Sequence, residues 1–136
     1  MSDSGPLLEV DDLHVRFRTR DGVVSAVNGM SFTLDAGETI AILGESGSGK
    51  SVTAQAIMGI LPSKTATIPQ GSIRYRGTEL VRLRERDYRQ LRGAKIAMVF
   101  QDALSALNPV TSVGRQVSEM FRVRGDMSRR QAKAAA

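Results

Sequence analysis

The residues best suited to chemistry stand together in residues 44–51. They read Gly-Glu-Ser-Gly-Ser-Gly-Lys-Ser and match the phosphate-binding pattern G-x-x-x-x-G-K-[ST] at every fixed position. Glycines let the backbone turn tightly with its N–H groups directed inward, where they can donate to phosphate oxygens. Lys50 would place a positive charge beside the β- and γ-phosphates of a nucleoside triphosphate, and the Ser51 hydroxyl would ligate Mg²⁺. We therefore expect a nucleotide site formed by Gly44, Glu45, Ser46, Gly47, Ser48, Gly49, Lys50 and Ser51.

The segments on either side of this loop are those that would position it. The preceding residues 39–43 (Thr-Ile-Ala-Ile-Leu) form a short apolar run, which predicts a buried strand. After the loop, apolar residues recur at roughly helical spacing until Pro62, which predicts a helix that starts at the loop. A strand, a glycine-rich loop and a helix in this order direct the helix N-terminus at an anion. The alternative is a glycine-rich turn with an incidental lysine.

Length and composition limit the classes of protein to consider. A chain of 136 residues with 41% hydrophobic and 24% charged residues is typical of one globular domain. It contains no Cys, so disulfides and cysteine-ligated metals are excluded within it. The N-terminal residues lack the apolar stretch of a secretory signal, and no run approaches the roughly 20 apolar residues of a membrane span. Any association with a membrane is therefore expected to depend on a partner.

The net charge of +5 is concentrated in residues 74–95, which contain eight basic and three acidic residues. Such a segment could bind nucleic acid or anionic lipid. The alternative is a solvated helix face, because the charges alternate with apolar residues at near-helical offsets and no aromatic cluster is present for base stacking. The solvated face is the favoured interpretation, and no nucleic-acid partner is expected. The only histidine, His14, is most simply on the outward side of a strand.

The rest of the sequence predicts an antiparallel β layer ahead of the loop and helices after it. Alternating apolar residues predict a strand over residues 8–17 and a turn at 20–22. Further strands are predicted at 23–27 and 30–34, with Asn28-Gly29 as a hairpin turn between them. Later elements are predicted as strands at 72–76 and 96–100 and helices at 81–92 and 111–124, with a turn at 76–77. The strands at 39–43 and 96–100 are expected to lie parallel, joined through a helix.

The last predicted helix begins at a capping box, in which Ser128 is followed three residues later by Gln131. Residues 129–136 have high helix propensity, but no Gly or Asn closes the helix and no apolar stripe is present for it to bury. We interpret this pattern as an N-terminal fragment cut inside a helix.

Read together, the phosphate loop and residues 95–109 resemble the nucleotide-binding subunits of ABC transporters. Three stretches resemble more narrowly the ATPase subunits of dipeptide, oligopeptide and nickel importers: residues 7–10 with 15–21, residues 36–59, and residues 100–109 with 113–114. Ala103 stands where the family commonly has proline. The resemblance implies an α/β phosphate-loop NTPase core with an N-terminal antiparallel β layer, truncated before the second half of the domain. The implied divisions are 1–38 (β layer), 39–101 (core) and 102–136 (start of the helical subdomain).

The resemblance also implies roles for single residues. Phe17 matches the aromatic that stacks on adenine, although an ordinary inward strand residue would look the same. Gln101 matches the glutamine whose amide reaches Mg²⁺ and the attacking water, and its alternative is a polar strand terminus. Lys50 and Gln101 are thus the expected catalytic residues, Ser51 and Gln101 the expected metal ligands, and ATP with Mg²⁺ the expected ligands.

The implied partners are membrane permease subunits and a second ATPase subunit in a head-to-tail dimer, at the cytoplasmic face of the plasma membrane. The 136 residues contain no signature loop, no apolar strand ending in Asp and Glu, and no switch histidine. The polypeptide itself is therefore expected to bind nucleotide weakly without hydrolysis and to be marginally folded. Two alternatives stay open. One is a soluble ABC-type ATPase that acts on nucleic acid or the ribosome, and the other is a noncatalytic nucleotide-binding fragment.

Overall fold

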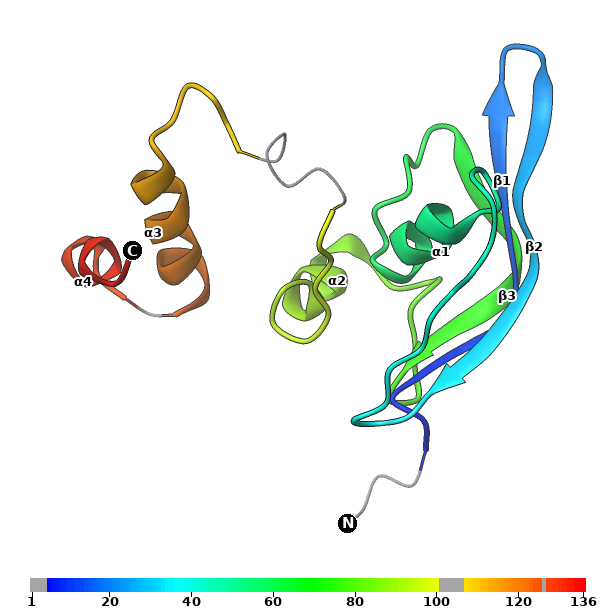
Figure 1. Ribbon diagram of the computed structural model, residues 1–136, viewed down its shortest axis with the longest axis horizontal. Coiled ribbons are helices and arrows are strands. Elements are labelled where there is room, and N and C mark those ends of the chain that lie inside the picture. Colours follow the sequence, from blue (N-terminus) through cyan, green and yellow to red (C-terminus); the bar gives the residue numbers. More distant parts are fainter. Residues whose placement is uncertain (1–4, 101–106, 126) are drawn as a thin grey trace. The chain divides into compact units, whose positions relative to one another are not determined.

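The computed structural model describes residues 5–100, 107–125 and 127–136 (Figure 1). Internal contacts divide the chain into two units, Met1–Ile96 and Ala97–Ala136, and each unit is described by itself. Within the described residues, no helix combines the length and the apolar character needed to cross a membrane.

The first unit is built on a four-stranded antiparallel sheet. Its strands are β1 (Leu8–Thr19), β2 (Gly22–Leu34), β3 (Ala66–Tyr75) and β4 (Thr78–Glu79), in the order β2-β1-β3-β4. The predicted turns at 20–22 and 76–77 are confirmed, because β1 pairs with β2 and β3 with β4 directly across them. The predicted hairpin turn at Asn28-Gly29 is wrong. β2 runs through these residues, because pairing with the long β1 continues beyond them and one extra residue is absorbed as a register irregularity opposite Leu13 and His14.

The core of this unit lies between the sheet and two short helices, α1 (Lys50–Ile57) and α2 (Glu85–Leu91). Side chains alternate along β1, so that Val10, Leu13 and Val15 are fully buried. The buried cluster is completed by apolar residues of β2, α1, β3, the segment after β4, and α2, namely Val27, Ala56, Ile73, Leu80 and Tyr88. The alternation that predicted the first strand therefore also gives the face that positions α1.

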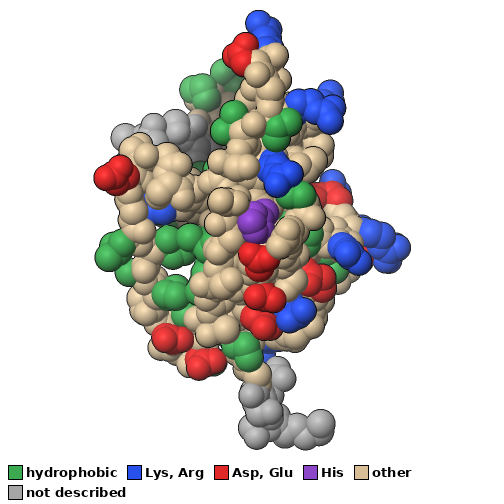
Figure 2. Space-filling view, turned by 90° about the vertical axis from the view of Figure 1, so that its right-hand side faces the viewer, with side chains coloured by type: hydrophobic (Ala, Val, Ile, Leu, Met, Phe, Trp, Pro, Cys, Tyr) green, Lys and Arg blue, Asp and Glu red, His purple; other side chains and the backbone are tan. Residues whose placement is uncertain are grey.

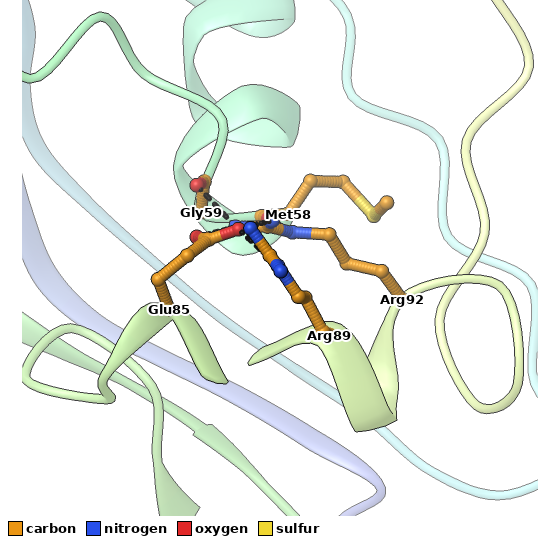
Figure 3. A network of polar contacts seen from close by, with 5 residues as sticks. All are labelled: Met58, Gly59, Glu85, Arg89 and Arg92. Carbon is orange, nitrogen blue, oxygen red and sulfur yellow. Dashed lines mark hydrogen bonds and ion pairs between the residues drawn. The ribbon is translucent and has the colours of Figure 1, made fainter. Parts of the chain in front are cut away.

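Arg92 joins α2 to the C-terminal end of α1 (Figure 3). Its Nε donates to the carbonyl of Met58 at 2.8 Å, and its Nη2 donates to the carbonyl of Gly59 at 2.6 Å. The guanidinium also pairs with Glu85 at 2.8 Å and lies 4.8 Å from the centroid of the Tyr88 ring. Carbonyls at a helix end lack an intrahelical donor and favour a nearby cation, and the last turn of α1 contains no basic residue of its own. Arg92 therefore caps α1 from a different helix.

Glu85 holds the Arg92 guanidinium in place. We predict that the contribution of Glu85 to the free energy of unfolding depends on pH. The hydrogen bond from Arg92, with further contributions from Arg89, lowers the pKa of the Glu85 carboxyl from its ordinary value of 4.5. A carboxyl whose pKa is lower in the folded state stabilises the fold above its unfolded pKa, and this contribution disappears as the pH falls through the folded pKa. We expect Glu85→Gln to lower the free energy of unfolding near neutral pH and to have no effect in strong acid, as measured by urea denaturation across pH.

Glu119→Gln is the matched control, since Glu119 is exposed and forms no ion pair with any residue that the structure describes. We expect it to leave the free energy of unfolding near neutral pH unchanged, where Glu85→Gln lowers it. A Glu85→Gln effect that stays constant from neutral pH to pH 3 would contradict the prediction.

Two predicted strands do not form in the structure. Residues 39–43 and 97–100 have no strand pairing, and Ile96 makes only an isolated parallel bridge to Arg92. Leu43 and Val99 are about nine-tenths exposed. Parallel strands depend on hydrogen bonds to neighbouring strands, and the described residues supply none to these two segments. The expected parallel pairing of 39–43 with 96–100 is therefore corrected.

The second unit contains α3 (Val113–Arg124) and α4 (Arg129–Ala135). The predicted capping box at the start of α4 is confirmed: the Ser128 hydroxyl accepts from the Gln131 amide, and the Gln131 side chain accepts from the Ser128 amide. Ala132 of α4 is fully buried, so this short helix does bury one side chain. Val113, Val117 and Met120, on one face of α3, remain exposed.

Candidate functional site

The phosphate loop is held against the sheet at its last glycine. Gly49 is the N-cap of α1 and has φ +90°, a left-handed conformation that favours glycine. A Cβ at this position would lie 2.4 Å from the carbonyl oxygen of Ala26 and 3.1 Å from the Val27 side chain. Only a residue without a side chain fits between the loop and β2. The contact therefore fixes where the loop ends and α1 begins.

Lys50 directs its ammonium back into the loop. Its Nζ donates to the carbonyl oxygens of Gly44 at 2.7 Å and Glu45 at 2.5 Å, and to the Ser48 hydroxyl at 3.2 Å. These three oxygens come from both arms of the loop, so the ammonium lies within its curve. The charge predicted to meet phosphate groups is thus at the centre of the loop.

The loop offers several amide donors that no part of the described protein uses. Among the backbone amides of residues 44–51, that of Ser48 donates to the carbonyl of Glu45 at 3.3 Å, and the others have no acceptor within the described residues. The first turn of α1 contains no acidic residue, and no side chain caps it. Free amides, a helix N-terminus and one ammonium form a donor set with the chemistry of a phosphate site. The residues present therefore fit a nucleoside triphosphate.

Ser51 lies exposed in the first turn of α1, and its hydroxyl has no hydrogen-bond partner among the described residues. No group of three or more His, Cys, Asp or Glu side chains able to hold a metal ion occurs in the described part of the chain. The free hydroxyl of Ser51 is compatible with its predicted role as a ligand of Mg²⁺, which stays a prediction. A Mg²⁺ ion at this position would take its other ligands from phosphate oxygens and water, as Mg²⁺ commonly does.

Phe17 lies on β1 opposite Val24 of β2 and Ala66 of β3. Its ring is half-buried and packs against the core cluster. Both interpretations from the sequence are compatible with this position, because the inward side of the ring contributes to the core and part of the ring stays accessible. Phe17 lies on β1 and the phosphate loop contacts β2, so the same β1–β2 hairpin carries both. Gln101, the expected metal ligand and catalytic residue, lies outside the described residues.

Thr53 contacts the last glycine of the phosphate loop, and the sequence did not predict this contact. Thr53 is fully buried, and its hydroxyl donates to the carbonyl of Gly49 at 3.0 Å and lies 3.4 Å from the sulfur of Met30. Its amide donates to the same carbonyl at 2.8 Å. A threonine four residues after the final loop glycine could have signalled this bond, because Ser and Thr hydroxyls often donate to the carbonyl four residues earlier. Thr53 thus secures the first turn of α1 against β2.

The basic segment 74–95 is largely neutralised by carboxylates. Five of its cations form ion pairs, namely Arg74, Arg84, Arg86, Arg89 and Arg92. This pairing favours the interpretation as a solvated, structural segment.

The outer face of the sheet carries charges of both signs, and Figure 2 shows them around the chain's only histidine. His14 donates from Nε2 to the Asp12 carboxylate at 3.0 Å and is partly exposed, as predicted for the outward side of a strand. Hydrogen bonds from Gln70 and then His14 lower the pKa of the Asp12 carboxyl. This face therefore presents a mixed polar surface.

A glycine-rich loop with unused backbone amides and a lysine within its curve, at the start of a helix packed on a sheet, is typical of phosphate-loop nucleotide-binding proteins. The family model described as "ABC transporter" matches residues 27–136. The chain therefore belongs to the ABC transporter family, and the resemblance stated from the sequence is confirmed.

The curated proteins that the chain resembles include ATP-binding proteins of dipeptide and oligopeptide transport. The chain is 48% identical over 127 residues to the dipeptide transport ATP-binding protein DppD of Bacillus subtilis (strain 168), which covers 93% of this chain and 38% of the relative. It is 46% identical over 130 residues to the oligopeptide transport ATP-binding protein OppD of the same organism, covering 96% and 36%. The probable D,D-dipeptide transport ATP-binding protein DdpD of Escherichia coli (strain K12) is 41% identical, covering 96% and 40%. The chain thus spans well under half the length of these relatives.

Solved structures show the same fold. A dimeric structure of MJ0796, a bacterial ABC transporter cassette, superposes with a TM-score of 0.71 at 18% identity, covering 93% of this chain and 53% of that one. A structure of MJ0796 described as a post-hydrolysis state bound to ADP and Pi gives a TM-score of 0.72 at 20% identity. The fold class predicted from the sequence, part of an ABC-type phosphate-loop cassette, is confirmed, although strands 39–43 and 96–100 are unpaired here.

Proposed function

We propose that this chain binds Mg-ATP at residues 44–51 and that the longer protein it belongs to hydrolyses ATP to drive import of peptides or related small solutes. The observation that supports this most is the loop itself, in which the Lys50 ammonium lies within the curve and several backbone amides have no acceptor among the described residues. The high identity to transport proteins for dipeptides and oligopeptides supports the substrate class. Permease subunits and a second ATPase subunit are the proposed partners, at the cytoplasmic face of the membrane.

Within this proposal, each loop residue has a defined task. The amides of the loop and the ammonium of Lys50 hold the β- and γ-phosphates, and the Ser51 hydroxyl ligates Mg²⁺, which supplies charge neutralisation when bound. Phe17 offers the accessible side of its ring to the adenine, since aromatic faces stack well on bases. Gln101 orients the attacking water.

We expect the 136-residue polypeptide to bind ATP without sustained hydrolysis. It contains no signature loop and no acidic pair after an apolar strand, so it supplies neither a general base nor the partner loop that closes the site. Such a base typically contributes about 10²- to 10⁴-fold in rate. Phosphate release from purified polypeptide, measured beside ATP titration, tests this, with Lys50→Ala as the background control. Steady release that depends on Lys50 would overturn the proposal that the polypeptide is inactive.

The role of Gln101 is tested in the longer protein. We expect Gln101→Ala to leave ATP affinity near normal and to slow hydrolysis by about 10²-fold, because its amide acts on water and metal rather than on the base or phosphates. Gln101→Glu is a matched variant that keeps the length of the side chain and one oxygen. ATP affinity and steady-state hydrolysis are the two readouts. A collapse of affinity with unchanged turnover of the bound nucleotide would contradict the assignment.

A further inference from the structure

The second unit contains a groove between α3 and α4 that the proposed function does not use. Its volume is about 610 Å³, within the range of roughly 300 to 1,000 Å³ that small-molecule sites occupy. The polar side chains that line it are Ser112, Arg115, Ser118 and Arg122 on the side of α3, and Arg129 and Lys133 on α4. None of the described residues that line it is Asp or Glu.

The four cations of this groove lack partners in the part of the chain that the structure describes. Arg115, Arg122, Arg129 and Lys133 are all exposed, and none forms an ion pair or a side-chain hydrogen bond with a described residue. This differs from segment 74–95, where most arginines are paired with carboxylates. Cations gathered around one groove repel each other, and a bound anion would relieve that repulsion.

The remaining lining groups add neutral donors to these charges. Arg115, Ser118 and Arg122 are spaced at i, i+3 and i+7 and therefore share one face of α3. Ser112 is the N-cap of α3, whose first turn contains no acidic residue and no side-chain cap. Guanidinium groups, hydroxyls and open helix amides together match the oxygens of a phosphate group. The lining contains no aromatic side chain for a nucleobase and no large aliphatic side chain for an acyl chain.

We propose that the α3–α4 groove binds a multiply charged phosphorylated ligand, independently of the phosphate loop. The shared chemistry is two or more phosphate groups held by Arg115, Arg122, Arg129 and Lys133. Such groups could come from a soluble oligophosphate or from two or more phospholipid headgroups that lie side by side in a membrane. This site goes beyond the proposed function and does not depend on it, because it lies in a different unit from residues 44–51.

The first experiment separates this groove from the phosphate loop. Tripolyphosphate is titrated calorimetrically into the Lys50→Ala chain, in which the loop has lost its ammonium. We expect saturable binding that weakens by at least roughly tenfold when Arg122→Gln and Arg129→Gln are added, since charge-assisted contacts have effects of this size. The matched control adds Arg82→Gln and Arg130→Gln, two exposed arginines outside the groove lining, and should bind as tightly as the Lys50→Ala chain. Far-UV circular dichroism checks that all variants keep their helices.

A second set of probes identifies the source and the chemistry. Sedimentation with vesicles of phosphatidylcholine containing phosphatidic acid reports a lipid headgroup, and tripolyphosphate reports a soluble ligand; binding to either one, lost with Arg122 and Arg129, supports the site. Absence of binding to both overturns it. Equal weakening by the control pair, or hexaglutamate bound as tightly as tripolyphosphate, overturns the assignment to phosphate chemistry.

Discussion

Lys50→Ala is expected to remove most of the ATP binding of this chain. The ammonium lies inside the loop, and among the described residues of the loop no other positive charge is placed to meet the β- and γ-phosphates. A charge-assisted hydrogen bond contributes about 1.5 to 3 kcal/mol, so we expect affinity to fall by roughly ten- to 150-fold. Isothermal titration with Mg-ATP measures the change.

Lys64→Ala is the control for this prediction, because Lys64 is an exposed lysine of the same unit outside the loop and its loss changes net charge equally. Its ATP affinity should match that of the unmodified chain. Equal titration curves for the unmodified chain and Lys50→Ala would show that residues 44–51 do not bind the triphosphate as proposed.

Gly71→Ala is expected to cause the largest loss of stability of any single change considered. Gly71 lies in β3 with φ +97°, and a Cβ there would lie 2.4 Å from the carbonyl oxygen of Asp12 and 2.6 Å from the Cα of Leu13. A left-handed conformation costs about 1 to 2 kcal/mol for a residue with a side chain. Overpacking against backbone that cannot move away adds about 1 to 3 kcal/mol.

Gly77→Ala separates these two contributions. Gly77 also has a positive φ, +75°, but nothing lies within 4 Å of a Cβ at its position. We expect it to lose only the conformational part, about 1 to 2 kcal/mol, against about 2 to 5 kcal/mol for Gly71→Ala. Urea denaturation of both variants measures the difference. If Gly77→Ala proved as destabilising as Gly71→Ala, the close approach of β1 to β3 would not contribute.

Local patterns in the sequence predicted local structure well. The phosphate loop, the turns at 20–22 and 76–77 and the capping box at Ser128 each depend on residues a few positions apart, and the structure contains them all. The predicted turn at Asn28-Gly29 failed because its outcome depends on β1, about 15 residues away along the paired register. A local turn sequence does not form a turn when the neighbouring strand is long enough to continue the hydrogen-bonded pairing past it.

The pairing of residues 39–43 and 96–100 could not be predicted from their composition. An apolar run indicates that a segment tends to be buried, but whether it pairs depends on which other strands lie beside it. The role of Arg92 could not be predicted either. A charge-rich helix predicts a solvated face, and the two carbonyls to which Arg92 donates belong to residues more than 30 positions earlier. Of the candidate site, the sequence predicted the donors, and the structure was needed to show Thr53 and the contact of Gly49 with β2.

The hydrogen bonds of Lys50 to Gly44 and Glu45 have a consequence for the affinity of the proposed ligand. A triphosphate that enters the loop must exchange these carbonyl partners for its own oxygens, so the loop competes with nucleotide for a single ammonium. The apparent dissociation constant then equals the intrinsic constant divided by the fraction of time that the ammonium is free of these partners. A ligand with too few phosphate groups to reach the Nζ of Lys50 should gain no affinity from this exchange. The loop should therefore discriminate between nucleotides by their number of phosphate groups.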